Sequence, residues 1–315
     1  MEAEAQVADL LISGIIYGSI ITLGAIGLTL MSDILNFFNF AYGDFFTLAA
    51  FCTMAFLNIL PDMGTFAHLS FGWSMLIAAL LSIVITVLAM LLFDFLFFKR
   101  LRKLGVTSLF MALASLGSSF IIRAAVYIIW GPKVRYYSSA IQISRKLPLG
   151  IRMKPDETVI LVSVLVLVIL VFYFLKRTKM GMAMRSLSDN KMLAQASGVE
   201  TDRVIMWTWI VSGVLAGVGG IFYGIQVQLS PTMGWDFLIA LFVAVILGGV
   251  GSFWGALIGG MTIGISEELI TGLIQNMTNA MAIQANISVY KPAIAFILVV
   301  VILLLKPYGL LGRKE

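Results

Sequence analysis

Apolar residues fall into blocks of roughly 17–25 residues along nearly the whole chain, separated by short polar stretches. A helix that rises about 1.5 Å per residue needs such a length to cross a hydrocarbon core of about 30 Å. The pattern therefore predicts an all-α fold, a polytopic bundle of about nine transmembrane helices within a range of eight to ten. The predicted spans are Ala8–Met31, Asp44–Leu60, Trp73–Phe98, Val106–Trp130, Thr158–Leu175, Val204–Ile225, Phe237–Val250, Phe253–Ile270 and Val289–Leu305.

Composition supports a single transmembrane domain over residues 1–315. Hydrophobic residues make up 60% of the chain, charged residues 12%, and the mean hydropathy is +1.02. A soluble domain has about 25% charged residues. The two longest polar stretches, about 131–157 and 176–203, are too short for a catalytic domain, because domains usually span roughly 50–250 residues. Any source of energy for this protein must therefore belong to another chain.

The basic residues gather at the ends of apolar blocks, so the net charge of +5 does not indicate nucleic-acid binding. Three basic clusters lie in segments 99–103, 176–203 and 306–314. With nine spans, all three fall on one side of the membrane, which the positive-inside bias assigns to the cytoplasm. The C-terminus is then cytoplasmic, the N-terminus lies outside, and segment 131–157 is extracytoplasmic.

The extracytoplasmic segment departs from this bias because it is itself basic. We interpret its charge as a candidate docking surface, formed by Arg135, Arg145, Lys146 and Arg152.

The chain carries few residues that could do chemistry. It has one histidine, His68, and one cysteine, Cys52, and it lacks the HExxH, CxxC and GxxxxGK[ST] patterns. No catalytic residue, metal site or nucleotide site is predicted, so the chain is not expected to be an enzyme.

Ionisable residues inside the predicted spans are few, because burying a charge in lipid is costly. Asp94 and Arg123 lie close enough to span ends to reach the membrane surface. Glu267 and Glu268 end the eighth span and are expected to be solvated. An acid buried near the midplane is not apparent, which disfavours an ion-coupled transporter.

The segment Ser32–Asp44 reads SDILNFFNFAYGD, which is too polar to extend a span and too apolar for a free loop. Irregular backbone at membrane depth is tolerated only where protein or a water-filled cavity surrounds it. We interpret this segment as a broken helix that lines a transport route. The alternative is an interfacial turn with aromatic anchors.

The cytoplasmic segment 176–203 predicts two short amphipathic helices. Ser188 or Asp189 could cap the second helix, and Gly198 suits the left-handed position past its end. Such a pair of helices is typical of a knob that fits a groove on a partner, although it could also lie on the membrane surface. The apolar positions are Met180, Ala183, Met184 and Leu187 in the first helix, and Met192, Leu193 and Ala196 in the second.

Small residues recur at four-residue spacing in several spans and predict close helix packing. An alternative is that these faces slide during transport. The positions include Gly14, Gly18, Ser115, Ser119, Gly213, Gly217, Gly220, Gly224, Gly255, Gly259, Gly260 and Gly264.

Four segments, in order along the chain, resemble the permeases of branched-chain amino acid ABC transporters. They are NFAYGDFF (Asn39–Phe46), the loop Gly181–Val199, GGVGSFWGALIGG (Gly248–Gly260) and KPYGLLG (Lys306–Gly312). The resemblance covers the chain and is closer to the H-type subunit than to its M-type partner. The family often has His at Tyr42, Glu at Asp44 and Arg at Lys306, and the first two departures bear on the substrate.

The resemblance implies a permease subunit in the cell membrane of a prokaryote, importing branched-chain or other hydrophobic amino acids. No cofactor is expected in this chain, since ATP and Mg would be bound by two cytoplasmic ATPase subunits. The other implied partners are a second permease subunit, either M-type or another copy, and an extracytoplasmic substrate-binding protein, the expected occupant of the basic docking surface. The residues implied near the pathway or gate are Asn36, Asn39, Tyr42, Gly43 and Asp44. Those implied in ATPase coupling are Gly181, Met184, Arg185, Ser188, Asp189, Asn190, Ala194 and Gly198.

Three other functions stay open. A permease of the same superfamily could carry urea, amides or another small solute. An ion-coupled carrier or channel would move solute without ATPases. A structural membrane scaffold is disfavoured by the polar segment Ser32–Asp44.

Overall fold

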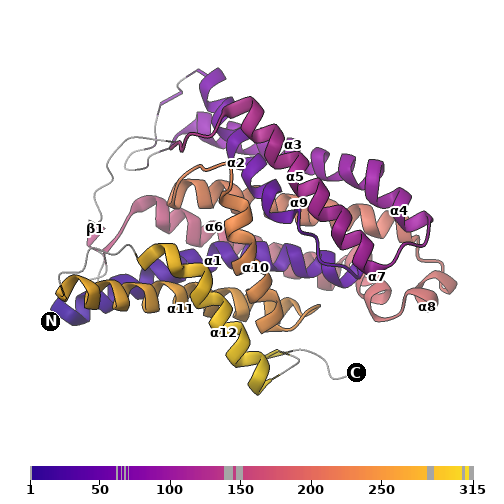
Figure 1. Ribbon diagram of the computed structural model, residues 1–315. Helices are drawn as coiled ribbons and strands as arrows, with labels where there is room; N and C mark the ends of the chain where they lie inside the picture. Colours follow the sequence, from indigo (N-terminus) through magenta and orange to yellow (C-terminus); the bar gives the residue numbers. More distant parts are fainter. Residues whose placement is uncertain are drawn as a thin grey trace.

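The computed structural model describes residues 2–61, 63–64, 66, 69, 71–137, 145–146, 152–281, 287–306 and 309–311 (Figure 1). The fold of these residues is helical apart from two short strands, β1 and β2, which pair antiparallel. The elements are α1 (Glu2–Leu35), α2 (Tyr42–Ile59), α3 (Trp73–Phe93), the π-helix η1 (Asp94–Phe98), α4 (Lys99–Lys103), α5 (Ser108–Trp130), β1 (Arg145–Lys146), β2 (Arg152–Met153), α6 (Pro155–Arg177), α7 (Lys179–Asp189), α8 (Lys191–Ala196), α9 (Thr201–Gln226), α10 (Met233–Gly248), α11 (Phe253–Ala280), the 3-10 helix η2 (Ile287–Tyr290) and α12 (Lys291–Leu305).

Seven helical segments in the described part of the chain are long and apolar enough to cross a membrane. The helices α10 and α12 are apolar but shorter. Seven and two give nine, in the order of the nine predicted spans. The helices α3, η1 and α4 count as one segment, Trp73–Lys103. The prediction of an all-α polytopic membrane bundle is confirmed.

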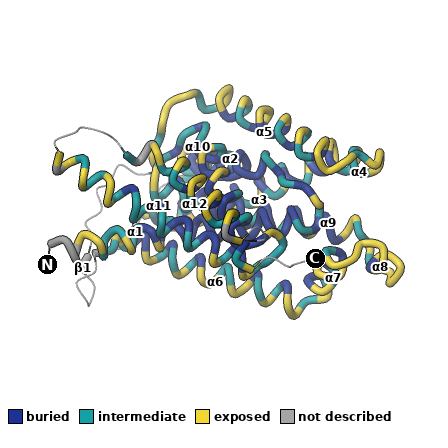
Figure 2. The backbone as a smooth tube through the Cα atoms, turned by 60° about the horizontal axis from the view of Figure 1, so that its bottom comes forward, coloured by how far each residue is buried: buried dark blue, intermediate teal, exposed yellow. Residues whose placement is uncertain are grey.

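The helix α1 runs through the middle of the bundle and packs against α11, α9 and α10. Buried positions concentrate in α1, α2, α9 and α10, whereas α4, α5 and α8 carry long exposed stretches (Figure 2). Helices α1 and α11 approach closely because glycines face each other. A Cβ at Gly264 would lie 2.1 Å from the Cα of Gly18. The predicted packing role of small residues is confirmed for this pair.

The end of α11 differs from the prediction. The sequence predicts a span that ends at Ile270, but the helix continues to Ala280. Its polar last turns run beside the start of α1, where the side chain of Gln6 donates a hydrogen bond of 3.0 Å to Asn276. Glu267 consequently lies inside the bundle with 1% of its surface exposed. The prediction that Glu267 is solvated is wrong.

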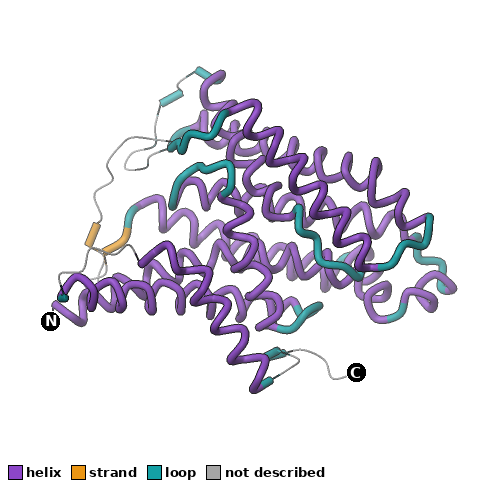
Figure 3. The backbone as a smooth tube through the Cα atoms, in the orientation of Figure 1, coloured by secondary structure: helices purple, strands orange, loops and turns teal. Residues whose placement is uncertain are grey.

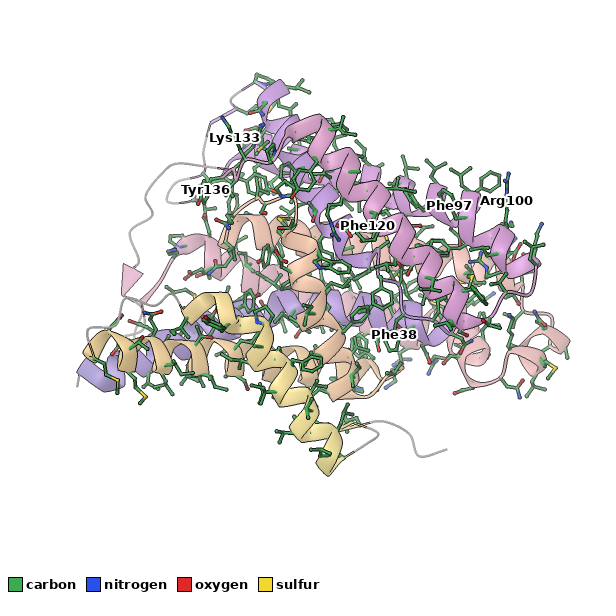
Figure 4. All side chains as sticks on the ribbon, viewed as in Figure 1. Phe38, Phe97, Arg100, Phe120, Lys133 and Tyr136 are labelled. Atoms are coloured by element: carbon green, nitrogen blue, oxygen red, sulfur yellow. The ribbon has the colours of Figure 1, made fainter. Side chains whose placement is uncertain are left out.

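The basic segments 99–103 and 176–203 lie at the same end of the molecule. Figure 1 shows α4, α7 and α8 together at one end, and the N-terminus and β1 at the other. An ion pair of 3.1 Å between Lys99 and Asp202 joins α4 to the start of α9. Figure 4 places Arg100 at this end and Lys133 and Tyr136 towards the opposite one. The shared side that the sequence predicts for these two clusters therefore agrees with the fold.

Candidate functional site

The chain is broken between α1 and α2, within the segment Ser32–Asp44. Asn36 has φ 57°, a left-handed conformation that asparagine adopts more readily than most residues. The side chain of Asn39 accepts a hydrogen bond of 3.0 Å from the N–H of Ala41, and α2 begins at the next residue, Tyr42. Figure 3 shows this break as a loop inside the helical outline. The predicted broken helix is confirmed.

Most of the break is covered by protein. Phe37 and Asn39 are buried, and the N–H of Phe40 donates a hydrogen bond of 2.9 Å to the Ser115 hydroxyl on α5. Asn36 is exposed. The side-chain nitrogen of Asn39 is buried without a hydrogen-bond partner among the described residues. Protein therefore covers most of the break, while its depth in the membrane, and with it the choice between a broken helix on a route and an interfacial turn, stays a prediction.

An ion pair lies in the first turn of α2. The Asp44 carboxylate is fully buried and accepts two hydrogen bonds of 3.0 Å from the Arg123 guanidinium on α5. The Ser119 hydroxyl, one turn before Arg123, also donates to this carboxylate. A two-point pair of this kind is the strongest way to compensate for two charges away from water. The Arg123 side chain is 14% exposed and pairs with Asp44, a contact that the sequence does not predict.

Aromatic rings cover the outer side of this ion pair. The guanidinium carbon of Arg123 lies 4.5 Å from the ring centroid of Trp235 on α10 and 5.6 Å from that of Phe120 on α5. These distances permit cation–π attraction, which is stronger in a dry environment. Phe120 and Phe38, both labelled in Figure 4, come from α5 and from the break. The charge pair is therefore fixed on several sides.

The helices α2 and α10 begin side by side. A Cβ at Gly234 would lie 1.8 Å from the carbonyl oxygen of Gly43, so only glycine allows this backbone contact. The N–H of Gly234 donates a hydrogen bond of 3.0 Å to the Thr47 hydroxyl. Both helices therefore present their N-terminal ends, which carry a partial positive charge, beside the buried Asp44. Helix N-termini that meet inside a membrane bundle are a feature of many substrate sites in transporters.

Aromatic residues from the break face the middle of α10. The rings of Phe38 and Phe40 both contact Phe242 edge to face, at centroid distances of 5.5 and 5.1 Å. All three side chains are partly buried. They form an apolar cluster at the break, and such a cluster suits an apolar solute better than a polar one.

The predicted coupling loop forms two short helices, α7 and α8, which we call the elbow. Gly198 has φ 85°, as predicted for a residue past the end of a helix. The cap of α8 is Asn190, whose side chain accepts a hydrogen bond of 2.9 Å from Leu193 N–H. The prediction that Ser188 or Asp189 caps this helix is wrong, because α7 continues through both residues.

The elbow residues fall into an anchoring set and an exposed set. Gly181, Met184 and Ala194 are buried within the described chain, and their predicted coupling role stays a prediction. Arg185, Asp189 and Asn190 are exposed. The most exposed apolar side chains are Met192 at 82% and Leu193 at 65%. A partner would therefore meet α8, where the sequence also predicts an apolar face.

The basic segment 131–157, predicted to be extracytoplasmic, is only partly described. Arg145, Lys146 and Arg152 lie on the paired strands β1 and β2, where Lys146 is the partner of Arg152. Arg135 is partly buried, and its guanidinium donates a hydrogen bond of 2.7 Å to the Trp130 carbonyl. Arg135 therefore also stabilises its own loop. Docking by these residues stays a prediction.

The loop after α5 contacts the middle of α2 through Tyr137. The Tyr137 hydroxyl donates a hydrogen bond of 2.9 Å to the Ala50 carbonyl. Burial raises the pKa of this phenol above its usual value, so Tyr137 keeps its proton at neutral pH.

The sequence did not indicate three residues that the structure brings to these sites. Ser119 and Arg123 complete the ion pair of Asp44, and Asp33 accepts a hydrogen bond from the elbow at Ser188. The available signal for the first pair was an arginine inside one predicted span and an aspartate at the start of another. Among the described residues, no group of three His, Cys, Asp or Glu side chains could hold a metal ion.

Comparison with known proteins gives a consistent family. Residues 10–305 match the family described as "Branched-chain amino acid transport system / permease component". The chain is 30% identical to the probable branched-chain amino acid transport permease protein LivH of Methanocaldococcus jannaschii, covering 95% of this chain and 90% of that one. It is 25% identical to the high-affinity branched-chain amino acid transport system permease protein LivH of Escherichia coli K12, with coverages of 96% and 94%.

A weaker likeness is to the solved structure "PsaBC from Streptococcus pneumoniae in complex with Fab", with 12% identity, coverages of 98% and 91%, and a TM-score of 0.48, too low to establish a shared fold. The family is shown by the match over residues 10–305 and by the relatives that align along most of their length. This chain belongs to the permease family of branched-chain amino acid transport systems.

Proposed function

We propose that this chain is the permease subunit of an ATP-driven importer of branched-chain or other hydrophobic amino acids. It would form the route through the cell membrane with a second permease subunit, either M-type or another copy. Two cytoplasmic ATPases would bind ATP and Mg, and an extracytoplasmic binding protein would deliver the solute. The N-terminus would lie outside and the C-terminus in the cytoplasm.

The observation that carries this proposal is the elbow, in a chain that belongs to the family. Its helix α8 exposes Met192 and Leu193, which is unfavourable in water unless a partner covers them. Its helix α7 is anchored by buried Met184 and Leu187. An exposed apolar tip on a fixed base fits a groove on a subunit that does mechanical work.

The proposal places the effect of the ATPases on the broken helix. The ion pair between Asp44 and Arg123 and the paired glycines Gly43 and Gly234 lie where two helices begin inside the bundle. The adjacent Phe38, Phe40 and Phe242 supply apolar surface, which supports a hydrophobic solute over urea or amides.

Reconstitution in liposomes tests the proposal. The chain is inserted alone, or together with the second permease and ATPases encoded beside it, and the binding protein is added outside. We expect leucine uptake that needs ATP and every partner, and none from the chain alone. Uptake by the chain alone would indicate a carrier or channel. Urea or amide uptake in place of leucine would refute the substrate class.

The docking surface has its own test. Reversing charge at Arg145, Lys146 and Arg152 is expected to weaken stimulation of ATP hydrolysis by the loaded binding protein, because charge complementarity speeds association. Lys133, an exposed basic residue in the loop after α5, serves as the matched control. Unchanged stimulation in the triple variant would reject the surface.

A further inference from the structure

A side-chain hydrogen bond joins the elbow to α1. The Ser188 hydroxyl, near the end of α7, donates a hydrogen bond of 2.5 Å to a carboxylate oxygen of Asp33. Asp33 lies three residues before Asn36, where the backbone turns into the break. The residues that meet here are 155 positions apart in the sequence. A hydrogen bond to a carboxylate is stronger than one between neutral groups, so this contact holds its two helices firmly.

The same aspartate also borders the turn between α10 and α11. Gly251 in this turn has φ 82°, and a Cβ at this position would lie 2.7 Å from the other Asp33 carboxylate oxygen. The N–H of Gly251 donates a hydrogen bond of 3.2 Å to Thr29, one turn before Asp33 on α1. The last turns of α1 therefore contact the elbow through one side and the glycine turn through another.

Two paths connect Asp33 with the ion pair of Asp44 and Arg123, one along α1 and one along α10. Along α1, the chain passes from Asp33 through the break to Asp44 in the first turn of α2. Along α10, the glycine turn connects back to Gly234, whose backbone contacts Gly43. Rigid helices and packed contacts of this kind carry energetic coupling between distant sites when they have two arrangements.

The elbow can transmit a force because its first helix, α7, is packed against the bundle. Met184 and Leu187 bury α7 against the bundle, whereas α8 is exposed. A force applied to Met192 is therefore transmitted through α7 to Ser188 and not absorbed by a loose loop. Asp33 on α1 accepts the hydrogen bond from Ser188.

We propose that Asp33 is a positioning residue that couples the elbow to the broken helix. By accepting from Ser188 and bordering Gly251, it makes α1, α7 and the α10–α11 turn move together when the ATPases close. This inference rests on the proposed function, since it assumes that ATPases bind the elbow. It assigns a role to a residue that touches neither nucleotide nor solute.

The test measures how tightly ATP hydrolysis follows transport in the complete reconstituted complex. The variants are Ser188→Ala, which removes the hydroxyl, Ser188→Thr, which keeps it, and Asp33→Ala. Ser186→Ala is the matched control, because Ser186 is exposed on the same helix. The readouts are subunit assembly, basal ATP hydrolysis, stimulation by loaded binding protein, and ATP hydrolysed per solute imported.

We expect Ser188→Ala and Asp33→Ala complexes to assemble. Their ATP hydrolysed per solute should rise by roughly tenfold, about the equilibrium effect of one hydrogen bond to a charged group. Ser188→Thr and Ser186→Ala should behave as the unaltered protein. An unchanged ratio in assembled Ser188→Ala and Asp33→Ala complexes would overturn the coupling role. Equal failure of Ser188→Thr and Ser188→Ala would also overturn it, because the hydroxyl would then be irrelevant.

These outcomes are separate from failure of the proposed function. If the unaltered complex imports no amino acid on ATP hydrolysis, the proposed function is wrong, and the variants are not needed to show it. If the unaltered complex is coupled and Asp33→Ala is equally coupled, only the inference on Asp33 is wrong.

Discussion

Tyr42 and Gly27 meet so closely that a Cβ at Gly27 would lie 1.9 Å from the Tyr42 hydroxyl oxygen. This hydroxyl donates a hydrogen bond of 3.2 Å to the Ser212 carbonyl, and the Ser212 hydroxyl donates one of 2.9 Å to the Gly27 carbonyl. The first residue of α2 is thus fixed between α1 and α9. A change at any of the three residues acts on the start of the broken helix.

Gly27→Ala is expected to lower the free energy of unfolding by about 1–3 kcal/mol, the usual range for an overpacked core. Tyr42→Phe removes the clashing hydroxyl and one hydrogen bond, and alone should cost only about 0.5–1.5 kcal/mol. The double variant should be more stable than the sum of the two effects, since the nearest contact of the new methyl group then lengthens from 1.9 Å to 3.0 Å, the distance to the ring carbon. Thermal unfolding in detergent measures this, and strict additivity would contradict the contact.

Breaking the buried ion pair should be severe. Arg123→Met leaves the Asp44 carboxylate buried without its partner, which costs roughly 3–5 kcal/mol of stability. The double variant Asp44→Ala/Arg123→Met should recover much of the stability but not leucine uptake, because no charge is then left unpaired. Glu200→Gln is the control, since its ion pair with Arg203 is exposed and worth roughly 0–1 kcal/mol. A mild effect of Arg123→Met alone would contradict the buried pair.

An introduced charge should have different effects at the exposed and at the buried apolar residues of the elbow. Leu193→Glu places a charge on the exposed tip, so ATPase binding should fall while the thermal stability of the isolated subunit stays unchanged. Met184→Glu places a charge in the buried base and should unfold the elbow or the subunit, because a buried unpaired charge is costly. Pull-down of the ATPase and thermal unfolding distinguish the two. Full ATPase binding by Leu193→Glu would contradict the partner surface.

The contact of α1 with α11 predicts a large effect of one methyl group. Gly264→Ala should destabilise the bundle, because the new Cβ would lie 2.1 Å from the Cα of Gly18. Gly117→Ala on α5 has open space around its Cβ and should be neutral or stabilising by up to about 1 kcal/mol through helix propensity. Melting temperatures of the two variants in detergent make the comparison. Equal effects would show that close packing does not set the requirement for glycine.

The features that could be predicted from the sequence are those carried by spacing within one segment. Span lengths gave the nine apolar helices, and the mixture of Asn36, Asn39 and aromatic residues gave the break. The left-handed Gly198 followed from its place after an apolar pattern. Each of these signals lies within a few turns of the structure that it describes.

Pairings between distant helices could not be predicted in this way. Asp44 and Arg123 are 79 positions apart, and nothing in either span indicates which depth and face the other occupies. Glu267 was misjudged because hydropathy ended its span early, whereas polar contacts between α11 and α1 extend the helix. Met184 was recognised as apolar, but its burial depends on how α7 lies against the bundle.

The C-terminal segment completes α10. The N–H groups of Leu310 and Leu311 donate hydrogen bonds of 2.8 and 3.0 Å to the carbonyls of Leu247 and Gly248, which end that helix. Backbone acceptors at a helix end need such partners when they are shielded from water. A truncation before Leu310 would remove these two hydrogen bonds and leave the carbonyls at the C-terminal end of α10 without partners. An affinity tag on a short linker would strain the same two residues.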